Sequence, residues 1–160
     1  ANEVSYYNPK AGTGLSVFDG GGQVSLPYGA MGAVENMDAH GGWVTSVIDL
    51  ARLAIATDGD PSTTEILSAE SQAIMVRDPG VGYGAGWFVN PTNWNHSGGM
   101  PGSASVVWVE NSGLIIVASL NGTPAFGTQE TADFFSDFIS GFLNIANSTT
   151  FPTKDLFDDF

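Results

Sequence analysis

The fold is decided by the stretch SASVVWVENSGLIIVASL, residues 103–120. Two runs in it, 103–110 and 113–120, are rich in β-branched and aromatic residues, which is typical of strands. The connection Asn111-Ser112-Gly113 is typical of a tight turn, so the two strands are expected to form an antiparallel hairpin. Because residues 114–118 are all apolar, the second strand needs cover on both faces, which places it in the middle of a layered sheet.

The residues before this hairpin predict a further strand and two helices. Residues 83–89 have the composition of a strand and complete a three-strand antiparallel meander. The tetrad Ser46-Val47-Ile48-Asp49 is a capping box, in which a hydroxyl and a carboxylate satisfy free N–H groups at the start of a helix. That helix is expected to end at the turn formed by residues 58–61, and a shorter helix is expected after Ser68.

A long helix is expected from Thr128, because apolar residues recur there on one face that can pack on the sheet. The members of this stripe are Phe134, Phe135, Phe138, Ile139, Phe142 and Leu143. The sequence therefore predicts an α+β fold, with an antiparallel sheet flanked by helices and a long C-terminal helix packed on it. We divide the 160 residues into an irregular, Gly- and Pro-rich lead-in (1–42), an α/β part (43–146) and a tail expected to fray (147–160).

The charge balance argues against several kinds of partner. The chain has 17 Asp and Glu against 4 Lys and Arg, for a net charge of -13, whereas nucleic acid and anionic lipid are bound by clustered cations. Its hydrophobic content of 42% indicates a folded protein rather than an acidic disordered one. No run approaches the ~18 apolar residues of a membrane span. The scarcity of Lys beside many Asp, Asn, Ser and Thr favours an exported protein, periplasmic or extracellular, although a cytoplasmic location stays open.

The two histidines each open an H-x-G triplet, His40-Gly41-Gly42 and His96-Ser97-Gly98. Only His96 lies between two predicted strands, in a Gly-rich segment where free backbone N–H groups could bind an oxyanion. A serine nucleophile is harder to find, because the residues three places before Lys10 and Lys154 are Tyr7 and Phe151, so the sequence holds no S-x-x-K. The sequence also holds no G-x-S-x-G.

The sequence gives weaker support to metal binding, glycoside hydrolysis and carbohydrate binding. With no Cys and two scattered histidines, neither a metal nor a cofactor is expected. The acidic pairs Asp58/Asp60 and Asp158/Asp159 lie in turn or tail sequence, which favours solvated loops over a glycosidase pair. The tryptophans at 87, 94 and 108 could line a carbohydrate groove, but their placement in strands favours core packing.

Five segments occur in an order that resembles the C-terminal half of the serine β-lactamase-like family. They are GGWVTS (41–46), DLARL (49–53), LSAE (67–70), YGAGW (83–87) and HSGGMPG (96–102). That family includes class C β-lactamases, penicillin-binding DD-peptidases and related esterases, and the resemblance covers roughly residues 3–143. It implies that the triplet lies on a strand bordering the active site, as part of the β-lactamase/transpeptidase-like fold.

By this resemblance, Ser97 and Gly98 line the substrate pocket and the N–H of Gly99 completes the oxyanion hole. His96 would hold the substrate carboxylate or help to organise proton transfer. Tyr6-Tyr7-Asn8 spells the family's Y-x-N, which makes Tyr6 a further candidate catalytic residue. Its position directly before the stretch that leads to Gly41 favours a structural role instead.

The family's S-x-x-K helix belongs N-terminal to the matched region, so the resemblance implies the C-terminal portion of a serine hydrolase that is inactive alone. Its partner would be an N-terminal fragment carrying S-x-x-K, or a second copy associating through the strand edge at 113–120. Two alternatives stay open. One is a non-catalytic binding or assembly module that keeps the sheet, and the other is a small self-sufficient serine esterase that uses Ser97 or Ser103.

Overall fold

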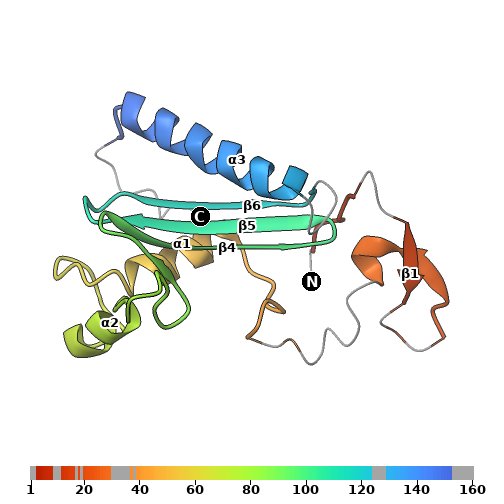
Figure 1. Ribbon diagram of the computed structural model, residues 1–160, viewed down its shortest axis with the longest axis horizontal. Coiled ribbons are helices and arrows are strands. Elements are labelled where there is room, and N and C mark those ends of the chain that lie inside the picture. Colours follow the sequence, from red (N-terminus) through yellow and green to blue (C-terminus); the bar gives the residue numbers. More distant parts are fainter. Residues whose placement is uncertain are drawn as a thin grey trace.

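The structure is a computed structural model that describes residues 3–8, 12–16, 18, 20–29, 37, 39–123 and 129–152. Its centre is a four-stranded antiparallel sheet in the order β3-β4-β5-β6 (Figure 1). The strands are β3 (Phe88–Val89), β4 (Asn93–Met100), β5 (Ser103–Glu110) and β6 (Ile115–Leu120). The hairpin expected over 103–120 is confirmed, with Val109 opposite Ile115 and Ala104 opposite Leu120.

The sheet differs from the expected meander in one strand. The strand expected over 83–89 is reduced to Phe88–Val89, and Asn93–Met100 forms a long strand of its own. The residue pattern put His96 between strands, whereas the structure puts it within β4, as the family resemblance implied. The reason is that β4 contains Asn, His, Ser and Gly, which have low strand propensity, so its conformation depends on backbone pairing with β5.

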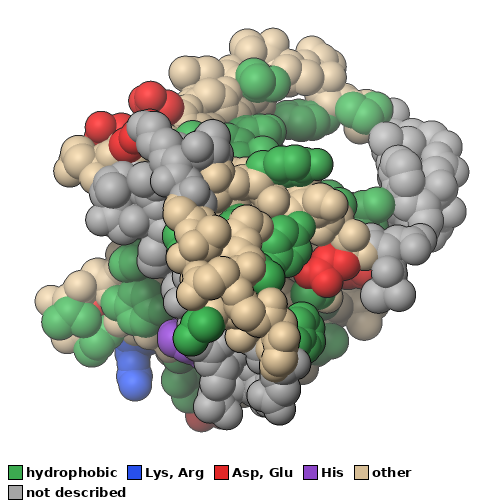
Figure 2. Space-filling model, turned by 90° about the vertical axis from the view of Figure 1, so that its right-hand side faces the viewer, with side chains coloured by type: hydrophobic (Ala, Val, Ile, Leu, Met, Phe, Trp, Pro, Cys, Tyr) green, Lys and Arg blue, Asp and Glu red, His purple; other side chains and the backbone are tan. Residues whose placement is uncertain are grey.

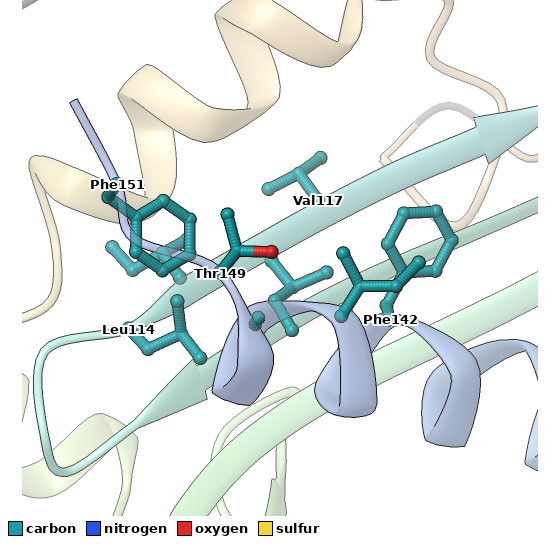
Figure 3. Close-up of a pocket in the computed structure, with 9 residues that line it drawn as sticks. Leu114, Val117, Phe142, Thr149 and Phe151 are labelled. Carbon is teal, nitrogen blue, oxygen red and sulfur yellow. The ribbon is translucent and has the colours of Figure 1, made fainter.

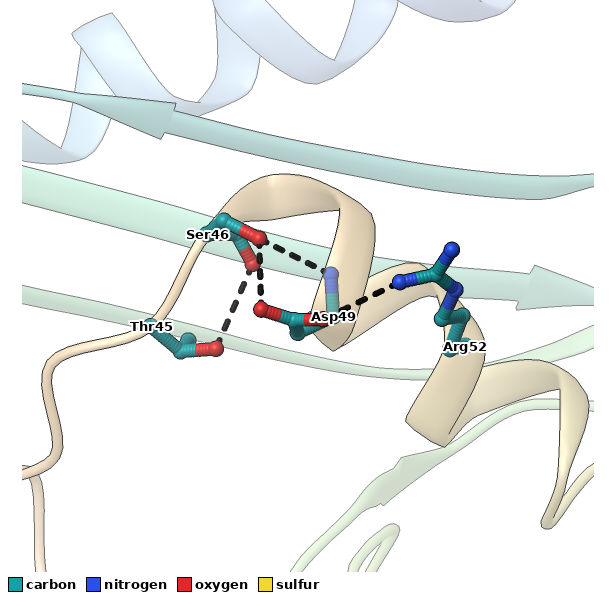
Figure 4. Close-up of polar contacts among 4 residues, drawn as sticks. All are labelled: Thr45, Ser46, Asp49 and Arg52. Atoms are coloured by element: carbon teal, nitrogen blue, oxygen red, sulfur yellow. Dashed lines mark hydrogen bonds and ion pairs between the residues drawn. The ribbon is translucent and has the colours of Figure 1, made fainter. Parts of the chain in front are cut away.

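Two helices begin at the caps expected from the sequence. In α1 (Val47–Ile55), the Ser46 hydroxyl accepts a hydrogen bond from the Asp49 N–H at 3.1 Å and donates one to the Asp49 carboxylate at 2.8 Å (Figure 4). The same carboxylate accepts from Arg52 at 3.3 Å. In α2 (Ala69–Met75), the Ser68 hydroxyl accepts from the Ser71 N–H at 3.1 Å. Both expected helix starts are therefore confirmed.

The third helix, α3 (Gln129–Ser148), covers the face of the sheet opposite to α1 (Figure 1). A Cβ added at Gly99 of β4 would lie 3.5 Å from the ring of Phe135, so α3 lies on the sheet as expected, whereas Phe142 of its apolar stripe is 38% exposed. The proposed cap Thr128 lies outside the described residues. The helix continues two residues into the segment expected to fray, and no helix in the described part of the chain has the length and apolarity of a membrane span.

The core is thin and lies on both faces of the sheet. On the α1 face, Ala54 packs with Trp94 of β4 and with Val107 and Val109 of β5. On the α3 face the most buried side chain is Val106, which is 2% exposed. The cluster around Ala54 thus holds α1 on the sheet against β4, the strand that carries the candidate site.

The first segment of the chain forms a short hairpin that the sequence analysis did not predict. Strands β1 (Thr13–Leu15) and β2 (Gln23–Ser25) pair antiparallel, and the 3-10 turn η1 (Leu26–Tyr28) follows. This hairpin stands beside the main sheet near the turn that joins β4 and β5 (Figure 1). Tyr7 pairs in parallel with Gly122, just beyond the end of β6.

Candidate functional site

Two backbone N–H groups of β4 lie at an edge that no strand covers in the described part of the chain. Met100 and Ser103 face each other across the two-residue turn Pro101-Gly102, so they form a hydrogen-bonded pair. Because hydrogen-bonded pairs alternate along an antiparallel ladder, the N–H groups of Ser97 and Gly99 point away from β5. Among the described residues, β3 is the strand on that side, and it reaches only as far as the pair Phe88–Asn95. The Gly99 N–H is therefore placed to donate to a ligand, as an oxyanion-hole donor must.

The His96 side chain is exposed and surrounded by aromatic rings on the α1 face of the sheet. The ring of Phe88 is stacked on the imidazole, with centroids 5.7 Å apart and an interplanar angle of 29°. Tyr83 and Trp87 present their rings at 6.3 and 6.5 Å in edge geometry. Sequence reasoning missed this aromatic wall, although Tyr83 and Trp87 open and close the YGAGW motif and Phe88 is the next residue.

The structure does not bring His96 together with either candidate serine. Ser97 follows His96 in the strand, so its side chain points to the opposite face of the sheet. Ser103 pairs with Met100, which lies four residues and roughly 13 Å along the strand from His96. Gly98 has open space where a Cβ would be, so the strand leaves room for a ligand there.

Tyr6 lies at the turn of the β4–β5 hairpin, away from His96 in the middle of β4. Its Cβ is 3.0 Å from the position that a Cβ on Gly102 would take. The phenol donates a 2.6 Å hydrogen bond to the Glu3 carboxylate. This bond, together with burial and the charge of Glu3, raises the pKa of Tyr6 to about 12. A phenol with a raised pKa and a carboxylate partner is a poor general base at neutral pH.

The other candidates occupy ordinary structural positions. His40 lies exposed in a turn that precedes α1, and its backbone N–H donates a hydrogen bond to the Met37 carbonyl at 2.6 Å. Asp58 and Asp60 accept backbone hydrogen bonds within their own turn, each at 2.8 Å, and burial raises the pKa of Asp58. Asp158 and Asp159 lie outside the described residues. In the part of the chain that the structure describes, no cluster of three or more His, Cys, Asp or Glu could hold a metal ion.

The tryptophans serve packing and hydrogen bonding. Trp94 is 5% exposed and meets the edge of Trp87, with ring centroids 4.4 Å apart. The indole N–H of Trp108 donates to the Glu110 carboxylate at 2.6 Å. None of these contacts forms a carbohydrate platform, which needs an exposed aromatic face.

The open β4 edge, the His96 triplet and the helices around them fit one family. The family model described as Beta-lactamase matches residues 5–135. The chain belongs to the β-lactamase family. No curated protein and no solved structure matches it significantly.

Membership of the β-lactamase family supports descent from serine hydrolases. The match runs from the segment that contains Tyr6, through all four strands of the main sheet, to the first turns of α3. It therefore contains the whole of the candidate site on β4.

Proposed function

We propose that this chain provides the substrate-binding strand and one oxyanion-hole donor of a serine hydrolase of the β-lactamase and penicillin-binding type. The acyl-accepting serine would come from a segment carrying S-x-x-K, which this sequence does not contain. The observation that supports the proposal is the outward-pointing N–H of Gly99, three residues along β4 from the exposed His96, on an edge that no described strand covers in a β-lactamase-family chain.

In the proposed reaction the supplied serine attacks the carbonyl carbon of an ester or amide, and negative charge develops on the carbonyl oxygen. The Gly99 N–H donates a hydrogen bond to that oxygen, and the N–H of the nucleophile residue is the second donor. Ser97 and Gly98 bind the substrate along the strand edge. His96 holds a substrate carboxylate or helps to organise proton transfer. Because no covalent step is possible without the serine, the isolated chain is expected to be inactive.

Hydrolysis assays test this proposal directly. The purified chain is incubated with nitrocefin and with a p-nitrophenyl ester, alone and with an upstream fragment that carries S-x-x-K. We expect no turnover from the chain alone and turnover with the fragment, reduced by His96→Ala. Turnover by the chain alone that His96→Ala abolishes would overturn the proposal.

A non-catalytic assembly module is the second candidate, because many large apolar side chains are exposed, among them Trp43 at 71% and Ile145 at 61%. It predicts that the upstream fragment binds without restoring hydrolysis. The third candidate, a self-sufficient esterase, requires Ser97 or Ser103 to react. Labelling with a fluorophosphonate and peptide mapping tests it, and the separation of both serines from His96 favours no labelling.

A further inference from the structure

The contacts that the His96 imidazole makes with other described residues are all with aromatic rings, and none of them is a hydrogen bond. An exposed side chain without a hydrogen bond ordinarily changes rotamer within nanoseconds. In catalytic sites a histidine is usually oriented by a third group that hydrogen-bonds to one of its ring nitrogens. Because the described residues supply no such group here, the orientation of His96 depends on packing.

Phe88 is the residue that covers a face of the imidazole. Its ring lies 5.7 Å from that of His96 at an interplanar angle of 29°, whereas Tyr83 and Trp87 meet the imidazole at 67° and 84°. The two nitrogens of an imidazole form hydrogen bonds in the plane of the ring. A ring stacked on the face can therefore fix that plane and still leave both nitrogens to a ligand.

The backbone of Phe88 is held from both sides. Phe88 pairs with Asn95 of β4 on one side and forms an isolated antiparallel bridge with Tyr83 on the other. Next to it, the Val89 N–H donates to the Gly82 carbonyl at 2.9 Å. The rings of Tyr83 and Phe88 also meet edge to face, with centroids 4.9 Å apart. The Phe88 ring is thus presented to the imidazole by paired backbone and not by a free loop.

The turn that carries Tyr83 and Trp87 is anchored on the end of α2. The Gly84 N–H donates to the Trp87 carbonyl at 2.8 Å, and the Ala85 N–H donates to the Met75 carbonyl at 2.9 Å. A Cβ on Gly84 would lie 2.6 Å from the Met75 carbonyl oxygen, so only glycine allows this close approach. All three aromatic residues around His96 therefore belong to segments that main-chain hydrogen bonds hold in place, as precise positioning requires.

The orientation of His96 matters because the chain offers few cationic groups to an anionic part of a ligand. It has 4 Lys and Arg against 17 Asp and Glu. The face shown in Figure 2 carries many hydrophobic side chains and little positive charge. A hydrogen bond from an imidazole N–H weakens steeply when it is misaligned, so what His96 contributes to binding depends on where its ring points.

From these contacts we infer that Phe88 is a positioning residue, whose ring holds the His96 imidazole in one orientation and leaves the ring nitrogens to the substrate. The inference rests on the proposed function for the part that His96 plays in the reaction, whereas the orientation itself is a property of this chain. Phe88 is 46% exposed, so it can be replaced without opening the core. Phe88→Leu keeps an apolar side chain but loses the flat ring, and Phe88→Tyr keeps the ring.

The first measurement is proton NMR of the imidazole rings in the isolated chain. The sequence has two histidines, and His40, which lies in the turn before α1, serves as an internal reference. An aromatic ring shields protons that lie over its face. We therefore expect Phe88→Leu to move the His96 ring protons downfield and to leave those of His40 in place, while Phe88→Tyr keeps the wild-type positions. Unchanged His96 signals in Phe88→Leu would overturn the inference.

Phe142→Leu is a matched control for the loss of a half-exposed ring. Phe142 is 38% exposed and lines an apolar hollow of about 230 Å³ between α3 and β6, together with Leu114 and Phe151 (Figure 3). This hollow lies on the α3 face of the sheet, whereas His96 shares the α1 face with the buried Trp94. We expect Phe142→Leu to leave the His96 signals in place, and a shift as large as that of Phe88→Leu would refute the inference.

The second measurement is a double-mutant cycle in the mixture with the fragment that carries S-x-x-K. We expect Phe88→Leu to lower kcat/KM about two- to tenfold when His96 is present, and Phe88→Tyr to retain it. In the His96→Ala background the same change should alter kcat/KM by less than about twofold, because a positioning residue acts only through the residue that it positions. An equal loss in both backgrounds would assign Phe88 a general structural role and refute the inference.

The two measurements separate failure of the inference from failure of the proposed function. Absence of turnover from every fragment mixture would refute the proposed function. The His96 signals of the isolated chain would still decide whether Phe88 orients the imidazole, because that measurement requires neither a nucleophile nor a substrate.

Discussion

Replacing Gly102 by alanine tests how the β4–β5 turn is held against the first segment of the chain. Gly102 has φ +83°, and a Cβ there would lie 2.9 Å from Pro27 Cγ and 3.0 Å from the Cβ of Tyr6. Gly113, in the β5–β6 turn, also has positive φ, +91°, but a Cβ there meets nothing within 4 Å. The pair of glycines therefore separates backbone strain from a steric clash.

The left-handed backbone costs alanine about 1–2 kcal/mol, which is the full effect expected for Gly113→Ala. Crowding against Pro27 and Tyr6 adds about 1–3 kcal/mol to Gly102→Ala. Unfolding in urea, followed by circular dichroism, should therefore show Gly102→Ala to be less stable than Gly113→Ala by about 2 kcal/mol. On heating, this difference corresponds to about 4–8 °C in Tm. Equal destabilisation by the two substitutions would show that the first segment does not pack on the turn.

Three other perturbations follow from single contacts. Ser46→Ala should lower the free energy of unfolding by about 1 kcal/mol in urea, because it removes the α1 cap, whereas Thr45→Ala should have little effect. The Asp78 carboxylate accepts the N–H groups of Gly80, Val81 and Gly82 at 2.7, 2.8 and 2.8 Å, which lowers the pKa of Asp78 below the ordinary 3.8. The order of this loop should thus be complete above pH 3.8 and be lost as the pH falls through the lowered pKa of Asp78. Amide exchange of Gly80 and Gly82 checks this, and protection that persists after the Asp78 carboxylate is protonated would contradict it. The raised pKa of Tyr6, about 12, means that its hydrogen bond to Glu3 stabilises the fold fully below pH 10 and is lost toward pH 12. Phenolate absorbance should show a late-titrating tyrosine that Tyr6→Phe removes, and the same titration in both proteins would count against the contact.

The parts of the fold that the sequence predicts correctly have local signals. At Ser46 and Ser68 a hydroxyl comes directly before an apolar helical pattern. Each hydroxyl accepts a hydrogen bond from the backbone N–H three residues later. The hairpin over 103–120 combines two apolar runs with a turn that includes a glycine of positive φ. In both cases the residues that specify the element lie within a few positions of each other.

The parts that the sequence does not predict depend on distant pairing. The segment Asn93–Met100 is a strand because β5 pairs along its whole length, and no β-branched residue within it indicates this. Unless residues 93–100 are recognised as a strand, the alternation of side chains that places His96 and Ser97 on opposite faces of the sheet cannot be assigned. The stacking of Phe88 on His96 likewise depends on the return of the chain after Val89. The sequence thus located the candidate site through the H-x-G triplet, but its orientation required the sheet.

The contact between Trp87 and Trp94 gives the site a built-in optical signal. The two indoles meet edge to face at an angle of 79°, and the ring centroid of Trp87 lies 6.5 Å from that of the His96 imidazole. Transition dipoles held this close and this steeply crossed couple to each other, so the pair should produce a near-ultraviolet dichroism band of its own. Any event that moves the β4 strand, including docking of a partner, can then be followed in the unlabelled protein.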